Sequence, residues 1–382
     1  MKRQKGFSLL EMMIATVILV SAVGSAMVAL LQAQHATQGI TLLASTQQNL
    51  RAGMHFIVRD LTQAGAGIPQ GGITIPYNAS AVSNLNRPGT IPQTIFSSAY
   101  TVLPPIVPGN VAGQLATSVN PSTLAVLTGH NTDIINIMYA DNTLVDVSGN
   151  SLNSYPIVQV LPSTPVCAGL ITSIAVTLAT NCFTMPGTAG TVPLAVGNLI
   201  MFTGSAGNAL GYITGVNGQV ISFAAGDPAN LNGTGLANGT LAKLIAGGGL
   251  ITMTRVWMIT YYIDTVTNPS RPQLIRQVNW PGYPASGPAN PPTVLADVIE
   301  DLQFSYDITN STAAAGSYGT AGPGNAPAPI APDTANQIRA VNIYLAARSE
   351  TPYVATQQFF RNNLVTQVCV RSLAFVPPFT VN

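Results

Sequence analysis

An uncharged, apolar run of membrane-spanning length, with one acidic residue at its start, is the feature that most constrains this chain. The run extends from Met12 to Leu31, Glu11 directly precedes it, and Lys2, Arg3 and Lys5 lie before both. About 20 apolar residues are enough for a helix to cross a bilayer. A charged side chain in such a helix costs about 2.5–3.5 kcal/mol on insertion scales, so Glu11 needs a functional explanation.

Simpler explanations account for only part of this segment. An ordinary secretory signal has an apolar region of about 7–15 residues, which is shorter than this run, although the small residues around Ala22 are compatible with a cleavage site. A plain membrane anchor explains the length but not Glu11. An acid in a first helical turn gains about 0.3–1 kcal/mol from the helix dipole, which is less than its insertion cost.

The segment Gly6-Phe7-Ser8-Leu9-Leu10-Glu11 resembles the type IV prepilin signal. In that family a prepilin peptidase cleaves after the glycine, the new N-terminal phenylalanine is methylated, and the glutamate supports filament assembly. The resemblance therefore implies cleavage between Gly6 and Phe7, N-methylation of Phe7 and an assembly role for Glu11. It divides the start of the chain into a leader, residues 1–6, and a segment that begins at Phe7.

A long helix is predicted for residues 7–64, called the stem below, of which residues 7–31 form the transmembrane segment or filament core. Apolar residues beyond residue 42 recur at spacings of three and four, which is typical of one helix face. That stripe comprises Leu43, Gln47, Leu50, Met54, Ile57, Leu61 and Ala64. Gly65, Gly67 and Pro69 then predict the helix end, because glycine accepts the left-handed conformation and proline cannot continue a helix.

Residues 70–382, called the head below, lose the helical period and predict a β-rich region. Short runs rich in β-branched and aromatic residues alternate with turn residues. The predicted strands are 134–139, 157–161, 199–203, 219–223, a hairpin of 255–264 and 273–280, and C-terminal strands at 302–308, 338–349 and 364–374. The fold class is thus α+β, with a stem helix before an antiparallel sheet.

Charge is scarce in the head. Only 7% of the residues in the whole chain are charged, against about 25% in ordinary soluble domains. No charged residue occurs between Asp146 and Asp227, so a low-charge insertion is predicted at about 147–226. The net charge of +1 offers no case for a nucleic-acid partner.

Cysteine usage fits an extracytoplasmic compartment. Cys167 and Cys182 lie in one turn-rich segment, and a disulfide closing a loop of this size is worth about 3 kcal/mol. We predict that these two are paired and that Cys369 is the odd thiol. Three cysteines cannot fix their connectivity by sequence alone.

Catalytic and metal sites are not indicated. His35 and His55 belong to the stem, which leaves His130 alone for any Ser/His/Asp arrangement. Asp141, Asn142 and Asp146 offer oxygen ligands to calcium, but their spacing is not that of an EF-hand, and a polar turn explains them equally well. The sequence predicts a protein that is not an enzyme and has no cofactor.

The end of the stem, Asp60-Leu61-Thr62-Gln63-Ala64-Gly65, resembles that of PilW-like minor pilins, and the whole order resembles the PilW and GspJ-like group. The resemblance implies a minor pilin at the tip of a type IV pilus that helps to start assembly. Its partners would be other pilins, the prepilin peptidase and the inner membrane, where it is a single-pass protein before it enters an extracellular pilus. The alternatives are a pseudopilin of a type II secretion system, and an adhesin whose insertion binds a surface or glycan.

Overall fold

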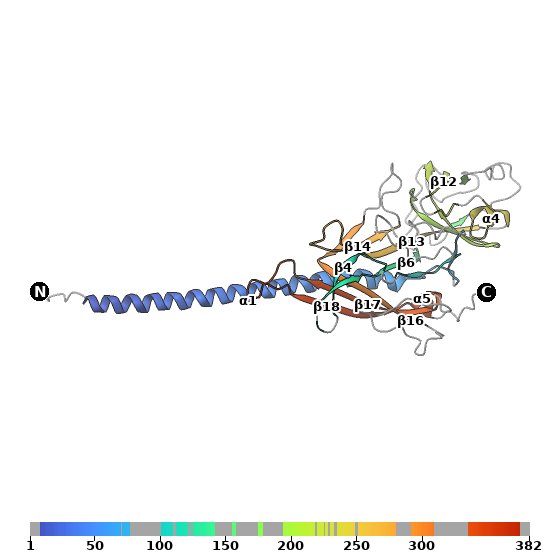
Figure 1. Cartoon of the computed structure of the whole chain (residues 1–382). Helices are drawn as coiled ribbons and strands as arrows, with labels where there is room; N and C mark the ends of the chain where they lie inside the picture. Colours follow the sequence, from blue (N-terminus) through green and yellow to red (C-terminus); the bar gives the residue numbers. More distant parts are fainter. Residues whose placement is uncertain are drawn as a thin grey trace.

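A computed structural model of the chain shows a long helix that enters a β-rich head (Figure 1). It describes residues 8–69, 71–76, 101–109, 112–120, 123, 125–141, 155–157, 175–178, 194–217, 220–224, 226–227, 230–232, 235–248, 251–279, 292–308 and 335–374. The α+β class predicted from the sequence is confirmed.

Helix α1, Leu9–Gln63, is about 82 Å long at 1.5 Å per residue. It ends as predicted, because Gly65 and Gly67 have φ angles of 78° and 69°. The N–H of Gly65 donates to the carbonyl of Met138 (2.8 Å), and a Cβ on Gly67 would lie 2.6 Å from Ala140 Cβ. Glycine at both positions therefore lets the end of α1 lie directly on the neighbouring strand.

Only the second half of α1 is buried in the head. Leu50, Met54, Ile57, Leu61 and Ala64 of the predicted stripe are buried, whereas Leu43 and Gln47 remain exposed. The head therefore covers this stripe from Leu50 onward.

The main sheet has eight strands, and β13, Ile251–Asp264, pairs antiparallel with four of them. Those four are β6 (Ile134–Ala140), β7 (Tyr155–Ile157), β9 (Leu199–Gly204) and β14 (Gln273–Val278); the others are β3 (Ile106–Gly109), β10 (Gly207–Tyr212) and β15 (Thr293–Asp297). The predicted hairpin is β13 and β14. Because β7 and β9 lie within 147–226, the low-charge insertion supplies strands to this sheet.

A second sheet contains β16 (Ile299–Ile308), β17 (Ile338–Arg348) and β18 (Arg361–Cys369). It confirms the predicted C-terminal strands, except that the last one ends at Cys369 and is followed by a short helix, α5, Arg371–Ala374. The turn buries Val370 and Leu373, and the N–H of Val370 donates to the carbonyl of Arg339 (2.8 Å).

The buried half of α1 lies between these two sheets, and all three elements share one apolar core (Figure 1). A smaller core at the far end of the head joins β1 (Ile73–Thr74), β6, β9, β10 and β13. Helix α4, Leu241–Ala246, lies there beside β10.

The remaining elements are short. They are β2 (Val102–Leu103), β4 (Leu115–Val119), β5 (Val126–Asn131), β8 (Ala175–Leu178), β11 (Gly215–Asn217), β12 (Val220–Ala224) and the 3-10 helix η2 (Ala335–Gln337). The predicted strand 219–223 corresponds to β12. The predicted strand 157–161 overlaps β7 at Ile157, and its other residues lie outside the described part of the chain.

Candidate functional site

The start of α1 is held by Glu11. Ser8 has an extended backbone and is the N-cap, and its N–H donates to Oε2 of Glu11 at 3.2 Å. This is half of the reciprocal contact that the pattern Ser-x-x-Glu favours at a helix start. The Ser-x-x-Glu pattern is present in the sequence, but no helix cap was predicted from it. Gly6 and Phe7, the other two predicted signal residues, lie outside the described part of the chain.

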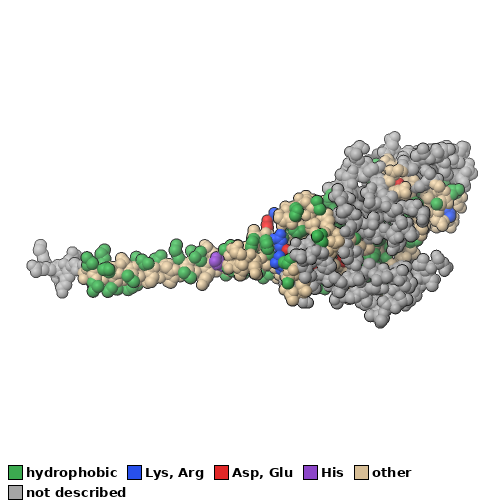
Figure 2. Space-filling model, in the orientation of Figure 1, with side chains coloured by type: hydrophobic (Ala, Val, Ile, Leu, Met, Phe, Trp, Pro, Cys, Tyr) green, Lys and Arg blue, Asp and Glu red, His purple; other side chains and the backbone are tan. Residues whose placement is uncertain are grey.

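On both sides of Glu11, the first half of α1 is an uncovered apolar surface, and Figure 2 shows hydrophobic side chains along it. The large hydrophobic side chains that are at least half exposed here are Leu9, Leu10, Met12, Met13, Ile14, Val17, Ile18, Leu19, Val20, Val23, Met27, Val28, Leu30 and Leu31. Within the described residues, α1 is the one helix that is long and apolar enough to cross a membrane. Surface of this kind requires lipid or another apolar partner.

Hydroxyl side chains in this exposed half are hydrogen-bonded within the helix. The hydroxyls of Thr16, Ser21 and Ser25 donate to the carbonyls three residues earlier, at 2.8–2.9 Å. A hydroxyl that is already bonded costs less to transfer out of water than a free one. This half of α1 is therefore suited to an apolar environment at its hydroxyl positions as well.

A clasp of aromatic side chains marks the end of the free stem. The loop between β17 and β18 brings Tyr353 and Phe360 onto Gly39, where an added Cβ would meet their rings at 3.5 and 3.7 Å. The ring of His35 meets that of Tyr353 edge-on, with centroids 6.5 Å apart. Residues before His35 extend beyond the head.

A buried ionic cluster joins the stem to the main sheet. Asp60 is fully buried, and its Oδ2 accepts hydrogen bonds from Arg276 Nε on β14 and from the Tyr261 hydroxyl on β13, each at 2.6 Å. Arg59 Nη2 lies 3.1 Å from the other carboxylate oxygen. Asp60 thereby ties α1 to two strands that are more than 200 positions away in sequence.

The electrostatics of this cluster stabilise its charges. Burial raises the pKa of Tyr261, and the Asp60 carboxylate raises it further, so this phenol is a permanent donor. Burial would lower the pKa of Arg276, but the hydrogen bond and the negative charge of Asp60 outweigh burial and raise it. In the sequence, Asp60 was identified only as part of the motif at the end of the stem, although an acid on an otherwise apolar helix face is itself a signal of a buried partner.

Ion pairs lie near the point where α1 enters the head, and Figure 2 shows charged side chains gathered there. Arg271 pairs with Glu350 at 3.0 Å, and Glu300 pairs with Arg348 and Arg361 at 3.0 and 2.9 Å. Because Arg348 lies on β17 and Arg361 lies opposite it on β18, Glu300 links these two neighbouring strands. Ion pairs thus link the strands of the second sheet at the stem end of the head.

The other sequence-predicted residues have mixed outcomes. Cys167 and Cys182 lie outside the described residues, and their disulfide stays a prediction. Cys369 is a free, exposed thiol on β18. Asp141 is buried and accepts a hydrogen bond from Arg255 Nε (2.7 Å), which assigns it to an ion pair. Within the described part of the chain, no group of three His, Cys, Asp or Glu residues could hold a metal ion.

Comparison with known families finds one match, which falls on the start of the chain. The family described as the prokaryotic N-terminal methylation motif matches residues 1–27. None of the curated proteins and none of the solved structures compared with the chain matches it. The motif and the exposed apolar helix together support a type IV pilin-like or pseudopilin-like protein, with processing by a prepilin peptidase and assembly with other pilins.

Proposed function

We propose that this chain is a minor pilin of the PilW-like group that enters a type IV pilus at its tip and helps to start assembly. The observation that carries the proposal is the bare apolar half of α1, which begins at Glu11 and continues into the core of a large β-rich head. Such a stem is suited first to a bilayer and then to neighbouring stems. The chain would accordingly be a single-pass inner-membrane protein before assembly and part of an extracellular filament afterwards.

Glu11 would act through its charge. Cleavage after Gly6 exposes an α-amine at Phe7, whose reference pKa is about 8. A carboxylate one helical turn away, or on an adjacent subunit, neutralises that amine where water is scarce. In the free subunit the carboxylate already accepts the Ser8 N–H, so it is positioned at the end of the helix where the new amine appears.

The tip position follows from the size of the head. A compact domain of about 313 residues has a radius of gyration of about 20 Å and a width of about 50 Å. Packed helices lie only about 8–10 Å apart, so heads of this width would crowd one another at every stem position. Low copy number and a terminal site avoid that crowding.

Quantitative mass spectrometry of sheared pili tests the proposal. We expect the mature chain to begin at Phe7 and to be present at few copies per filament. The variant Glu11→Ala should be inserted and cleaved normally but be depleted from pili. Thr16→Val is the matched control in the same apolar segment, since it removes a hydroxyl that bonds only within its own helix.

Three outcomes would count against this assignment. Uniform immunogold labelling of this protein along the pilus shaft would make it a major subunit. An unchanged number of filaments after deletion of its gene would remove the initiating role. Recovery with a type II secretion system and not with pili would assign a pseudopilin.

A further inference from the structure

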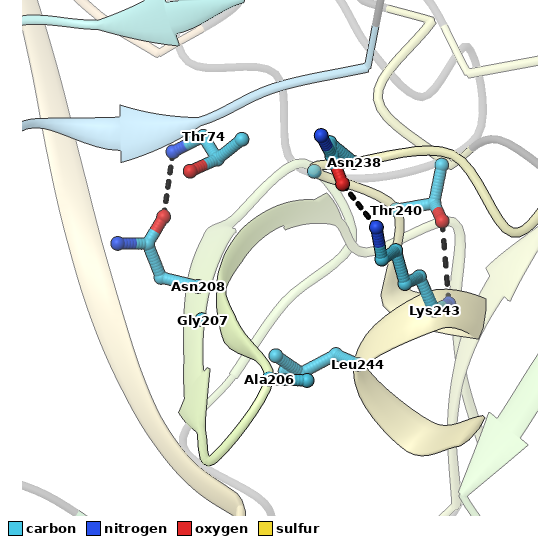
Figure 3. A pocket seen from close by; sticks show the side chains of 9 residues that line it. Thr74, Ala206, Gly207, Asn208, Asn238, Thr240, Lys243 and Leu244 are labelled. Atoms are coloured by element: carbon cyan, nitrogen blue, oxygen red, sulfur yellow. Dashed lines mark hydrogen bonds between the residues drawn. The ribbon is translucent and has the colours of Figure 1, made fainter. Parts of the chain in front are cut away.

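A polar pocket of about 180 Å³ lies at the far end of the head, between strand β1, the β9–β10 turn and helix α4 (Figure 3). The side chains that give it its chemistry are those of Thr74, Asn208, Asn238, Thr240 and Lys243. Amide, hydroxyl and ammonium groups thus face one cavity. Its size is below the roughly 300–1,000 Å³ of sites for drug-sized ligands, so it fits one small polar unit.

Hydrogen bonds hold the wall of this pocket in place. Asn208 Oδ1 accepts the N–H of Thr74 at 2.6 Å, which joins β10 to β1. Thr240 caps α4 by accepting the N–H of Lys243 at 3.3 Å. Gly239 has a φ of 79°, and a Cβ there would lie 2.4 Å from the carbonyl carbon of Ile75, so only glycine lets this loop lie against the backbone directly after β1. The side chains are therefore pre-positioned for binding.

Lys243 supplies the positive charge. Its Nζ donates to Asn238 Oδ1, as Figure 3 shows, and no carboxylate pairs with it among the described residues. It is the one lysine or arginine between Arg87 and Arg255 in the sequence. Asp227, the acid nearest to it in sequence, is buried and accepts two backbone N–H groups at 2.9 and 3.0 Å. Among the residues that the structure describes, the ammonium thus has neutral polar neighbours in the pocket and no acidic partner.

Further groups in the pocket are available to a ligand. Among the described residues, the Thr74 hydroxyl and the Asn238 Nδ2 amide have no hydrogen-bond partner. Lys243 therefore stands beside one neutral donor and one hydroxyl that both donates and accepts. This combination suits a ligand with one negative charge and several hydroxyl groups.

We propose that this pocket binds the terminal acidic sugar of a carboxylated glycan, such as a uronic acid. One ammonium balances one carboxylate, whereas a phosphate dianion would remain half uncompensated. The amide and hydroxyl groups match the ring hydroxyls of a sugar. An apolar ligand would leave them unpaired, at a cost in affinity.

The position of the pocket suits a binding role. It lies beside α4, at the end of the head opposite the free stem (Figure 1). A subunit inserted by its stem would present this end away from its neighbours' stems. The inference goes beyond the filament role and does not depend on it, because sugar binding is measurable on the isolated protein.

The test is titration of full-length, detergent-solubilised protein with methyl glucuronide, followed by ligand-detected NMR. Methyl glucoside is the neutral matched probe, and inorganic phosphate is the competing anion. We expect glucuronide to bind at least about tenfold more tightly than glucoside, with affinity falling as salt is added. Lys243→Gln should abolish that discrimination, and Lys243→Arg should retain most of it.

Asn238→Asp is a second variant, which places a carboxylate beside Lys243 and should weaken glucuronide binding by at least about tenfold. Urea unfolding of each variant verifies that the fold is intact. Equal affinity for the two sugars, absence of saturable glucuronide binding, undiminished binding by Lys243→Gln, or tighter binding of phosphate would each overturn the proposal. Pilus entry of Lys243→Gln should be normal, so failure here leaves the filament role untouched.

Discussion

Removing the Asp60 carboxylate is expected to loosen the stem from the head. Asp60→Ala would leave Arg276 without its ionic partner in a site where its side chain is only 16% exposed. Breaking a buried pair from one side costs about 3–5 kcal/mol. Because water still reaches part of Arg276, we expect a loss near the lower end, about 3 kcal/mol in the free energy of unfolding. Asp60→Asn keeps an acceptor for the Tyr261 hydroxyl and should lose less.

Urea unfolding of the full-length protein in detergent measures this loss. Arg59→Gln is the matched control, because the Arg59 side chain is 44% exposed and such pairs contribute at most about 1 kcal/mol. The double variant Asp60→Ala/Arg276→Met should lose less than the sum of the single losses, since no unpaired charge remains. A loss below about 1 kcal/mol for Asp60→Ala, or additive losses in the double variant, would refute the anchor role.

Three further predictions concern stability and processing. Burial raises the pKa of Asp301 to about 7 from a usual value near 4, so the folded state holds this proton more tightly than the unfolded state. The free energy of unfolding should therefore fall between about pH 4 and 7, by at most about 4 kcal/mol. Urea unfolding of Asp301→Asn should show a flatter pH profile. Gly53→Ala should lower the urea midpoint of unfolding, because its Cβ would lie 2.7 Å from a leucine methyl of β14. Gly24→Ala has no heavy atom within 4 Å of its added Cβ, so it should raise the helix content measured by circular dichroism. Mass spectrometry should find Phe7 as the first residue, and an intact leader in filament-associated protein would contradict the prepilin assignment.

Much of the fold could be predicted from local pattern. The 3.6-residue period and the Gly65 and Gly67 stop placed the helix, because both act over a few neighbouring residues. The β13–β14 hairpin was predictable since its strands are close in sequence and separated by turn residues. The prediction that strand 364–374 continues past Cys369 failed, because alternation alone did not indicate that Val370 and Leu373 would turn into the core.

The candidate sites were less accessible to sequence reasoning. Glu11 was identified because the cost of a charge in an apolar helix is legible without a structure. The pocket around Lys243 was not, since its walls come from β1, the β9–β10 turn and α4, which span about 170 positions. No local pattern brings Thr74 and Asn208 together.

The sequence by itself determined that a stem helix with an apolar first half, marked by Glu11 at its start, precedes a β-rich head of low charge. Composition, period and glycine positions carry those facts, because they act within single elements. Only the tertiary structure decided where the stem becomes buried, that Asp60 meets Arg276 and Tyr261, and that Lys243 faces a pocket. Such pairings depend on which strands lie side by side, and burial then makes each charge either costly or useful according to the partner it finds there.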